Sequence, residues 1–246
     1  MPSKYQFYAA LADQQTRQVT QSMGEWTGFL NTAGRLYKYP FEEQLMIHAQ
    51  RPDAVACAPI EVWNRSVNRY VKAGSKGIAL LDTTGGRGRL KYVFDVADTQ
   101  DGRHNTRRPL LWEMKPEHET VVRDSLLHNF DISDLQGNPL VDRNSDIGYV
   151  VYSLAQSLSA RYYEDNSNDI GYAVEDSFLD GLDEFNVSVA FKDALTVSTA
   201  YALMSRCGID PMDYLSGEDF QPVFGIATKF GWMFILIVPT RVQTEV

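Results

Sequence analysis

Cysteine is scarce in this sequence, and the two that occur, Cys57 and Cys207, stand far apart. This argues against the disulfide framework that stabilises small secreted domains. No signal peptide precedes the first predicted helix, so we expect a cytoplasmic location. Apolar runs are also short. The longest, residues 232–238, has less than half of the roughly 18 residues that a membrane span needs. The sequence predicts a soluble protein that contacts no membrane.

The usual signatures of catalytic and metal sites are missing too. No serine stands in a Gly-x-Ser-x-Gly elbow, and neither cysteine has a base beside it in the sequence. The basic loop 83–89 is rich in glycine but lacks the Gly-Lys-Ser/Thr ending of a P-loop. The histidines lie in different segments, without a second His or Cys at a ligand spacing: His48, His104, His118 and His128. We therefore predict a non-enzyme with no catalytic residue, no metal and no cofactor, although catalytic partners brought together only in space stay open.

Positive charge is concentrated in the first half of the chain. Residues 1–112 contain 15 Lys and Arg against 10 Asp and Glu, a net charge of +5, whereas residues 113–246 contain 8 against 22, a net charge of −14. The overall charge of −9 hides this basic front half, which is where a polyanion would bind. The length of 246 residues is enough for two domains, and we place their boundary at residue 112.

The predicted fold class is α+β, with N-terminal helices and a small antiparallel sheet in the first domain, followed by a mainly helical acidic domain. Apolar residues at a spacing of three and four predict helices within 5–22, over 23–37, over 41–50 and after Pro59. Strands are expected over 69–72, 77–81 and 90–96, with the first two joined by the tight connection 73–76.

Helical spacing continues in the acidic half, over 116–130, 147–163, 176–182 and 191–207. Gly208 and Pro211 are the expected stop signals after the last of these helices. The apolar segment 229–239 breaks this pattern, and we expect the C-terminal tail to pack poorly or to serve as an added strand.

Aromatic rings alternate with Arg, Lys and amide side chains between Trp26 and Val96, a mixture suited to stacking on bases and pairing with phosphates. The alternative is an ordinary core in which the rings are buried and the charges merely solvated. Trp63 in particular is as well suited to a core as to a stacking platform. The candidate DNA-binding residues are Trp63, Arg65, Arg69, Tyr70, Lys72, Lys76, Arg87 and Arg89.

The stretch from Trp26 to Leu81, together with Phe94-Asp95-Val96, resembles the N-terminal single-stranded-DNA-binding domain of ArdC-type antirestriction proteins. The shared features are Trp26, Glu43-Gln44 followed by Gln50-Arg51-Pro52, Trp63, and the run Val71-Lys72-Ala73-Gly74-Ser75-Lys76-Gly77-Ile78. The resemblance covers about a third of the chain. It implies binding of single-stranded DNA without sequence specificity, in proteins carried by plasmids and other conjugative elements.

The chain departs from that family after the resemblance ends. ArdC-type proteins continue into a metallopeptidase-like domain with His-Glu-x-x-His, which this sequence lacks, so peptidase activity is not implied. Residues 178–186 and 205–210 instead look like a helical segment of very large helicase- or methylase-like proteins of bacterial mobile elements, of which this chain would be a fragment or a short relative. The alternatives are a structural or protein-interaction domain, with the acidic helices as its docking surface, and a degenerate metallopeptidase-like relative.

Overall fold

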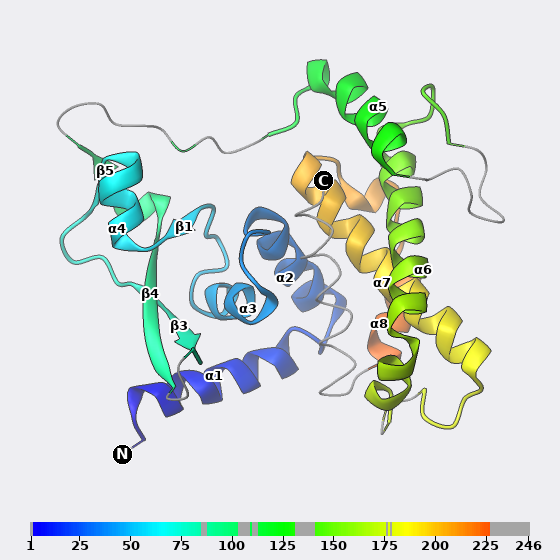
Figure 1. Cartoon of the computed structure of the whole chain (residues 1–246), viewed down its shortest axis with the longest axis horizontal. Helices are drawn as coiled ribbons and strands as arrows, with labels where there is room; N and C mark the ends of the chain where they lie inside the picture. Colours follow the sequence, from blue (N-terminus) through cyan, green and yellow to red (C-terminus); the bar gives the residue numbers. More distant parts are fainter. Residues whose placement is uncertain are drawn as a thin grey trace.

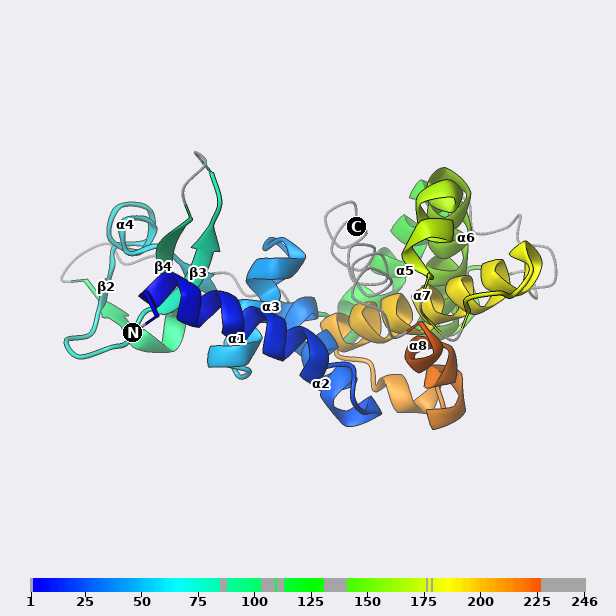
Figure 2. The same cartoon turned by 90° about the horizontal axis from the view of Figure 1, so that it is seen from below.

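The fold is α+β, and its two ends are built differently (Figure 1). The computed structural model describes residues 2–84, 88–102, 109, 113–130, 141–175, 177 and 179–226. Two small sheets lie at one end of the molecule and helices α5 to α8 at the other, with α2 and α3 between them in both cartoon views (Figures 1 and 2). No helix of the described part is both long and apolar enough to cross a membrane.

The sequence predicts the N-terminal helices, although the first two end earlier than expected, at residues 18 and 35 rather than 22 and 37. Helix α1 spans Lys4–Gln18 and includes much of the glutamine-rich run, α2 spans Met23–Arg35, and α3 spans Phe41–Gln50. Ser3 and Ser22 cap the first two helices, since each side chain accepts a hydrogen bond from a backbone N–H of the first turn. The apolar face predicted for α2 is buried, which confirms the spacing argument.

Two antiparallel sheets follow, where one was predicted. Strands β1 (Cys57–Ala58), β4 (Arg89–Asp95) and β3 (Ile78–Asp82) form the first sheet in the order β1-β4-β3. Strand β2 (Arg69–Val71) pairs with β5 (Thr99–Asp101) in the second.

The predicted pairing of residues 69–72 with 77–81 is therefore wrong. Gly74 does adopt the expected left-handed conformation, with φ +85°. However, the connection bonds to the segment before β5, because the backbone N–H of Lys72 and the Ser75 hydroxyl both donate to the carbonyl of Asp98. These contacts hold β2 beside β5 and leave β3 to bury Ile78 and Leu80 with Val93 of β4.

One side chain closes the free edge of β3. The Gln50 amide donates to the Ala79 carbonyl at 2.8 Å and accepts from the Ala79 N–H at 3.0 Å. An unpaired strand edge is a template for pairing with another chain, and Gln50 occupies it with hydrogen bonds of both kinds. Helix α3 is thereby fixed to the sheet at its last residue.

We expect Gln50→Ala to lower the free energy of unfolding by about 1–3 kcal/mol, because both Ala79 backbone groups lose their partner. Urea denaturation measures the loss. Gln18→Ala in α1 is the control, since its amide makes a long hydrogen bond of 3.5 Å to the side chain of Glu25 and no other bond to the described residues. Equal stability of the two variants would mean that water replaces the Gln50 contacts at no cost.

The helical half departs from its prediction in three places. Helix α6 runs from Ile147 to Ala173, well past the predicted end, and α7 begins at Glu184 rather than 191 because the Asp183 side chain caps it. Where a helix was predicted over 176–182, the described residues 179–181 form a turn, with Gly181 at φ +80°. As predicted, α7 ends at Cys207 with Gly208 in the left-handed conformation.

Short elements complete the description. Helix α4 (Ile60–Val62) continues directly into a π-helical turn, Trp63–Val67, and the 3-10 turn Pro116–His118 leads into α5, Glu119–Asn129. Further 3-10 turns at Val96–Asp98, Pro211–Asp213 and Gly217–Phe220 precede β5 and α8, Gln221–Gly225. The C-terminal segment 229–239 lies outside the described residues.

The main hydrophobic core joins both halves of the chain. Side chains of α2 and α3 pack in it together with α6, α7 and α8, and the Trp26 indole donates to the Ser198 hydroxyl of α7 at 3.1 Å. A smaller cluster lies between α1, α3 and the β3–β4 pair. The two-domain division at residue 112 stays a prediction, with apolar contacts that cross it.

Candidate nucleic-acid interface

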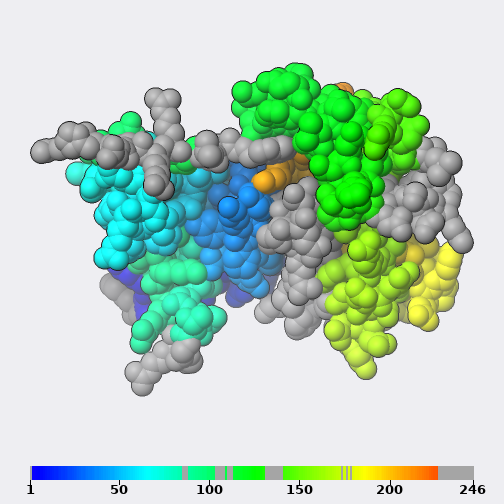
Figure 3. Space-filling view, turned by 45° about the horizontal axis from the view of Figure 1, so that its top comes forward, coloured from blue at the N-terminus to red at the C-terminus, as the bar shows by residue number. Residues whose placement is uncertain are grey.

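Five of the eight predicted DNA-binding residues are exposed on the part of the chain that carries the two sheets: Arg65, Tyr70, Lys72, Lys76 and Arg89. Figure 3 shows this part, coloured cyan to blue-green, at one end of the molecule and the helices of the acidic half at the other. Tyr70 is 46% exposed in the middle of β2, opposite Gln100 of β5. Its ring is therefore presented by a paired strand, which fixes its direction.

Trp63 is not part of this surface. Its side chain is buried, with 3% exposed, and the indole N–H donates to the Phe94 carbonyl at 2.9 Å. The π-helical turn that begins at Trp63 ends at Asn68 in a left-handed conformation, φ 52°, and this wide turn directs the indole toward β4. A buried indole with its N–H satisfied stabilises the fold and offers no face to a base.

The Arg69 side chain is bonded to other residues of the protein. Its guanidinium donates to the Thr99 hydroxyl at 2.7 Å and to the Thr99 carbonyl at 3.2 Å, and it forms an ion pair with Asp101. These contacts join β2 to β5 across the second sheet. Because the charge is neutralised locally, Arg69 contributes little to attracting a phosphate. Arg87 lies outside the described residues.

The four remaining cations, Arg65, Lys72, Lys76 and Arg89, differ in the contacts that they make within the protein. Lys72 donates from its amine to the Ala97 carbonyl, a neutral acceptor, at 2.8 Å. Arg89 stands opposite Asp82, whose pKa is lowered mainly by hydrogen bonds from Thr84 and further by Lys91 and Arg89. Among the ion pairs of the described residues, none involves Arg65 or Lys76. Arg65 and Lys76 are the cations best placed to receive an external anion.

Sequence reasoning missed one ring. Tyr92, 43% exposed, stands on β4 opposite Ala79. Gly77 lies against it so closely that a Cβ there would be 3.2 Å from the Tyr92 side chain and 3.1 Å from the Phe94 ring. The missed signal is the period-two alternation of β4, in which Val93 faces the core and its neighbours face away. Tyr92 thus adds an aromatic ring beside the Lys76–Gly77 backbone.

The buried carboxylate of Asp95 is explained by the backbone around it. It accepts hydrogen bonds from the N–H groups of Val55, at 2.7 Å, and Ala56, at 3.0 Å, through one oxygen, and from Ala97, at 2.9 Å, through the other. Burial, and then the nearby Asp95, raise the pKa of the Cys57 thiol to about 12. The thiol is therefore protonated at neutral pH and is a weak nucleophile.

Two further titratable side chains, His48 and Cys207, are packed within the fold. His48 lies within 2.8 Å of the Thr32 hydroxyl and edge-on to Phe29, and burial lowers its pKa. Burial raises the pKa of the Cys207 thiol to about 11. Across the described residues, no three His, Cys, Asp or Glu side chains come together as a metal site would require.

Comparison of the chain with protein-family models, with curated proteins and with solved structures finds no match.

Proposed function

We propose that this chain binds single-stranded DNA without sequence specificity, through the exposed side of its two small sheets. The observation that carries the proposal is that exposed rings and exposed cations occur together on the part of the chain that carries the two sheets: Tyr70 and Tyr92 stand on paired strands, and Arg65 and Lys76 stand in the adjoining turns. Stacking on rings together with cations along the backbone is how proteins hold a single strand regardless of its sequence. In this proposal the chain is a binding module and not an enzyme.

The binding mode follows from what a single strand exposes. Its bases are free to leave their neighbours and stack on a tyrosine ring, whereas the bases of a duplex are already stacked and paired. Lys72, Lys76, Arg65 and Arg89 would contact phosphates, which carry the same charge whatever the base. A preference for single strands and a lack of sequence preference are therefore both expected.

The resemblance to ArdC-type N-terminal domains supports the same conclusion. Several residues that carry the resemblance have structural roles here: Gln50 closes the edge of β3, and Asp95 binds three backbone N–H groups. Shared residues of this kind would preserve the sheets that present Tyr70 and Lys76. On this basis we also propose a cytoplasmic role in an antirestriction or helicase- or methylase-like protein of a bacterial conjugative element.

A protein partner for the acidic half is the second candidate. Large apolar side chains are exposed there, including Tyr172 at 75% and Phe185 at 74%. Apolar residues surrounded by acidic ones are suited to docking another protein. The two functions are compatible, and Phe185→Ser separates them, because it would weaken protein docking and leave DNA binding unchanged.

The direct test is fluorescence polarisation with single- and double-stranded oligonucleotides at two salt concentrations. We expect tighter binding of the single strand, and affinity that falls as salt rises because cations contact phosphates. Equal affinity for both forms would remove the stacking mode. Absence of binding at low salt would leave the structural or protein-interaction role.

Replacing Tyr70 by Ala should weaken binding of single-stranded DNA by about 1–3 kcal/mol, the usual contribution of one stacked base. The control Tyr70→Phe keeps the ring and should bind nearly as wild type, while Tyr172→Ala removes an exposed ring of the acidic half. Polarisation titrations at low salt measure all three. Wild-type affinity in a folded Tyr70→Ala variant would show that no base stacks there.

A further inference from the structure

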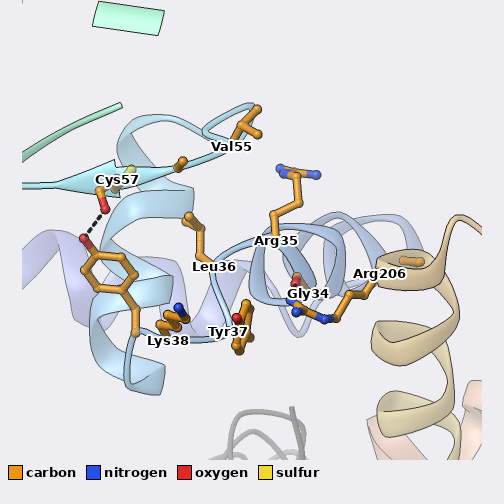
Figure 4. A pocket seen from close by; sticks show the side chains of 11 residues that line it. Gly34, Arg35, Leu36, Tyr37, Lys38, Val55, Cys57 and Arg206 are labelled. Atoms are coloured by element: carbon orange, nitrogen blue, oxygen red, sulfur yellow. Dashed lines mark hydrogen bonds between the residues drawn. The ribbon is translucent and has the colours of Figure 1, made fainter. Parts of the chain in front are cut away.

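The first sheet, β1-β4-β3, has one face packed on helices. Ile78, Leu80 and Val93 lie in the smaller hydrophobic cluster together with side chains of α1 and α3. Tyr39 and Cys57 pack against the same cluster, and the Tyr39 hydroxyl donates to the Cys57 carbonyl at 2.8 Å, the bond drawn dashed in Figure 4. This bond holds β1 to the segment after α2. The helices therefore fix one face of the sheet, and its opposite face is the one that presents a ring to solvent.

The strand register shows which side chains share that opposite face. Directly paired residues of antiparallel strands point to the same side of a sheet. All the described strand residues on this side are Ala, Leu, Tyr or Phe, in the pairs Ala79 with Tyr92, Leu81 with Leu90, and Ala58 with Phe94. The Tyr92 hydroxyl is the only hydrogen-bonding group among these six side chains. The strand side chains around the Tyr92 ring are thus apolar.

The Tyr92 ring leans toward Gly77 and leaves space on its other side. A Cβ at Gly77 would be 3.2 Å from both Cβ and Cδ1 of Tyr92, and 3.1 Å from the tip of the Phe94 ring. The two rings therefore gather where β3 begins. On the other side of Tyr92, toward the turn between β3 and β4, stand Leu81 and Leu90, both half-buried. This leucine pair is the surface beside the open side of the ring.

A nucleotide whose base stacks on Tyr92 places its sugar over this pair. Residues two apart along a strand are separated by about 7 Å, and a sugar is bonded directly to its base, so it reaches from Tyr92 to the leucines. The 2′-hydroxyl of ribose is a donor and an acceptor, and it is the group by which a protein distinguishes RNA from DNA. Over Leu81 and Leu90 it loses water without gaining a side-chain partner, whereas the 2′-methylene of deoxyribose is itself apolar.

We propose that this face of the first sheet selects deoxyribose over ribose, with Leu81 and Leu90 as the residues that determine the preference. The inference rests on the proposed function and adds to it the reason why the strand is DNA and not RNA. The exposed cations Lys76 and Arg89 stand at opposite ends of the β3–β4 pair. They would contact phosphates, which are the same in both polymers, so the discrimination comes from the sugar.

The test is fluorescence polarisation of the full chain with strands of deoxyuridine and of uridine of equal length, which differ only in the 2′-hydroxyl. The uridine strand should bind about tenfold more weakly, the usual effect of leaving one polar group without a partner. A 2′-fluoro strand is the control for sugar shape, because it keeps the pucker of ribose and has no hydroxyl. It should bind as the deoxyuridine strand does. Weak binding of the 2′-fluoro strand would assign the preference to pucker and overturn the proposal.

A pair of variants tests the leucines themselves. Leu81→Thr with Leu90→Thr gives the ribose hydroxyl a partner and should raise affinity for the uridine strand roughly fivefold. Leu81→Val with Leu90→Val is the matched control, because valine has the shape of threonine without its hydroxyl, and both residues suit a strand. The control, and also Tyr92→Phe, should keep the wild-type preference. An unchanged preference in the folded threonine variant would show that the sugar does not lie over these leucines.

The same titrations separate this inference from the proposed function. If both strands bind with equal affinity, binding of single strands stands and selection of the sugar is wrong. If neither strand binds at low salt, single-stranded DNA binding is itself contradicted, and the sugar preference with it.

Discussion

Replacing Trp26 by Ala will lower the free energy of unfolding by about 3–5 kcal/mol, the usual cost of truncating a buried aromatic side chain. The indole is fully buried in the core that joins α2 to α7, beside the Phe29 ring. Its N–H donates to the Ser198 hydroxyl, which is itself fully buried. The truncation removes the packing and leaves a cavity where the two halves of the chain meet.

Two controls separate packing from hydrogen bonding at this position. Ser198→Ala removes the hydrogen bond alone and should cost about 1 kcal/mol. Trp26→Phe keeps much of the volume and should fall between the two. Urea denaturation followed by far-UV circular dichroism measures each loss, and a decrease below about 1 kcal/mol for Trp26→Ala would contradict the described core.

Asp95→Ala should lower the free energy of unfolding by about 3 kcal/mol or more, because three backbone N–H groups lose the buried carboxylate that accepts from all of them. Asp95 ties the segment before β1 to the end of β4, so its removal should loosen the sheet that carries Tyr92. Asp95→Asn keeps one carbonyl oxygen and should cost less. Hydrogen exchange at Val55, Ala56 and Ala97 measures the effect locally.

The control for Asp95 is Asp53→Ala, which removes an exposed carboxylate from the preceding turn. Its effect should remain within about 0.5 kcal/mol, as is usual for surface substitutions. If Asp95→Ala were as mild as this control, solvent would have to reach the three N–H groups, and the described burial of Asp95 would be wrong.

The sequence predicted helices well where spacing and caps agree. Residues 41–50 stand between two prolines and form α3, and Gly208 ends α7, because these signals act within a few residues of the helix they bound. Strand pairing was predicted poorly. The partner of β2 is β5, about thirty residues away, and its choice depends on hydrogen bonds from Lys72 and Ser75 to Asp98 that no local pattern reveals.

For the candidate interface too, local sequence indicates which residue types are suited to DNA, but not which of them contact a neighbouring strand. Residue type identified Arg65, Tyr70 and Lys76 as suited to DNA, and each is exposed. Type alone could not show that Trp63 would turn inward on a π-helical turn or that Arg69 would pair with Asp101, because both outcomes depend on a neighbouring strand. Tyr92 was overlooked, although the alternation along β4 placed it on the face away from the core.

The central claim is tested most directly by reversing charge on the proposed surface. Arg65→Glu with Lys76→Glu changes two exposed cations of this surface that take part in no ion pair within the described part of the chain, and the matched control is Lys115→Glu with Arg161→Glu, both exposed residues of the acidic half. Affinity for a single-stranded oligonucleotide is measured by fluorescence polarisation across a salt series, on variants whose thermal unfolding matches the wild type.

The surface pair should bind much more weakly at low salt, and its salt dependence should fall by about one unit for each phosphate that the variant no longer binds. The control pair carries the same change in net charge and should bind almost as the wild type does. Unchanged affinity of the surface pair, or an equal decrease in both pairs, would contradict single-stranded DNA binding by the two sheets.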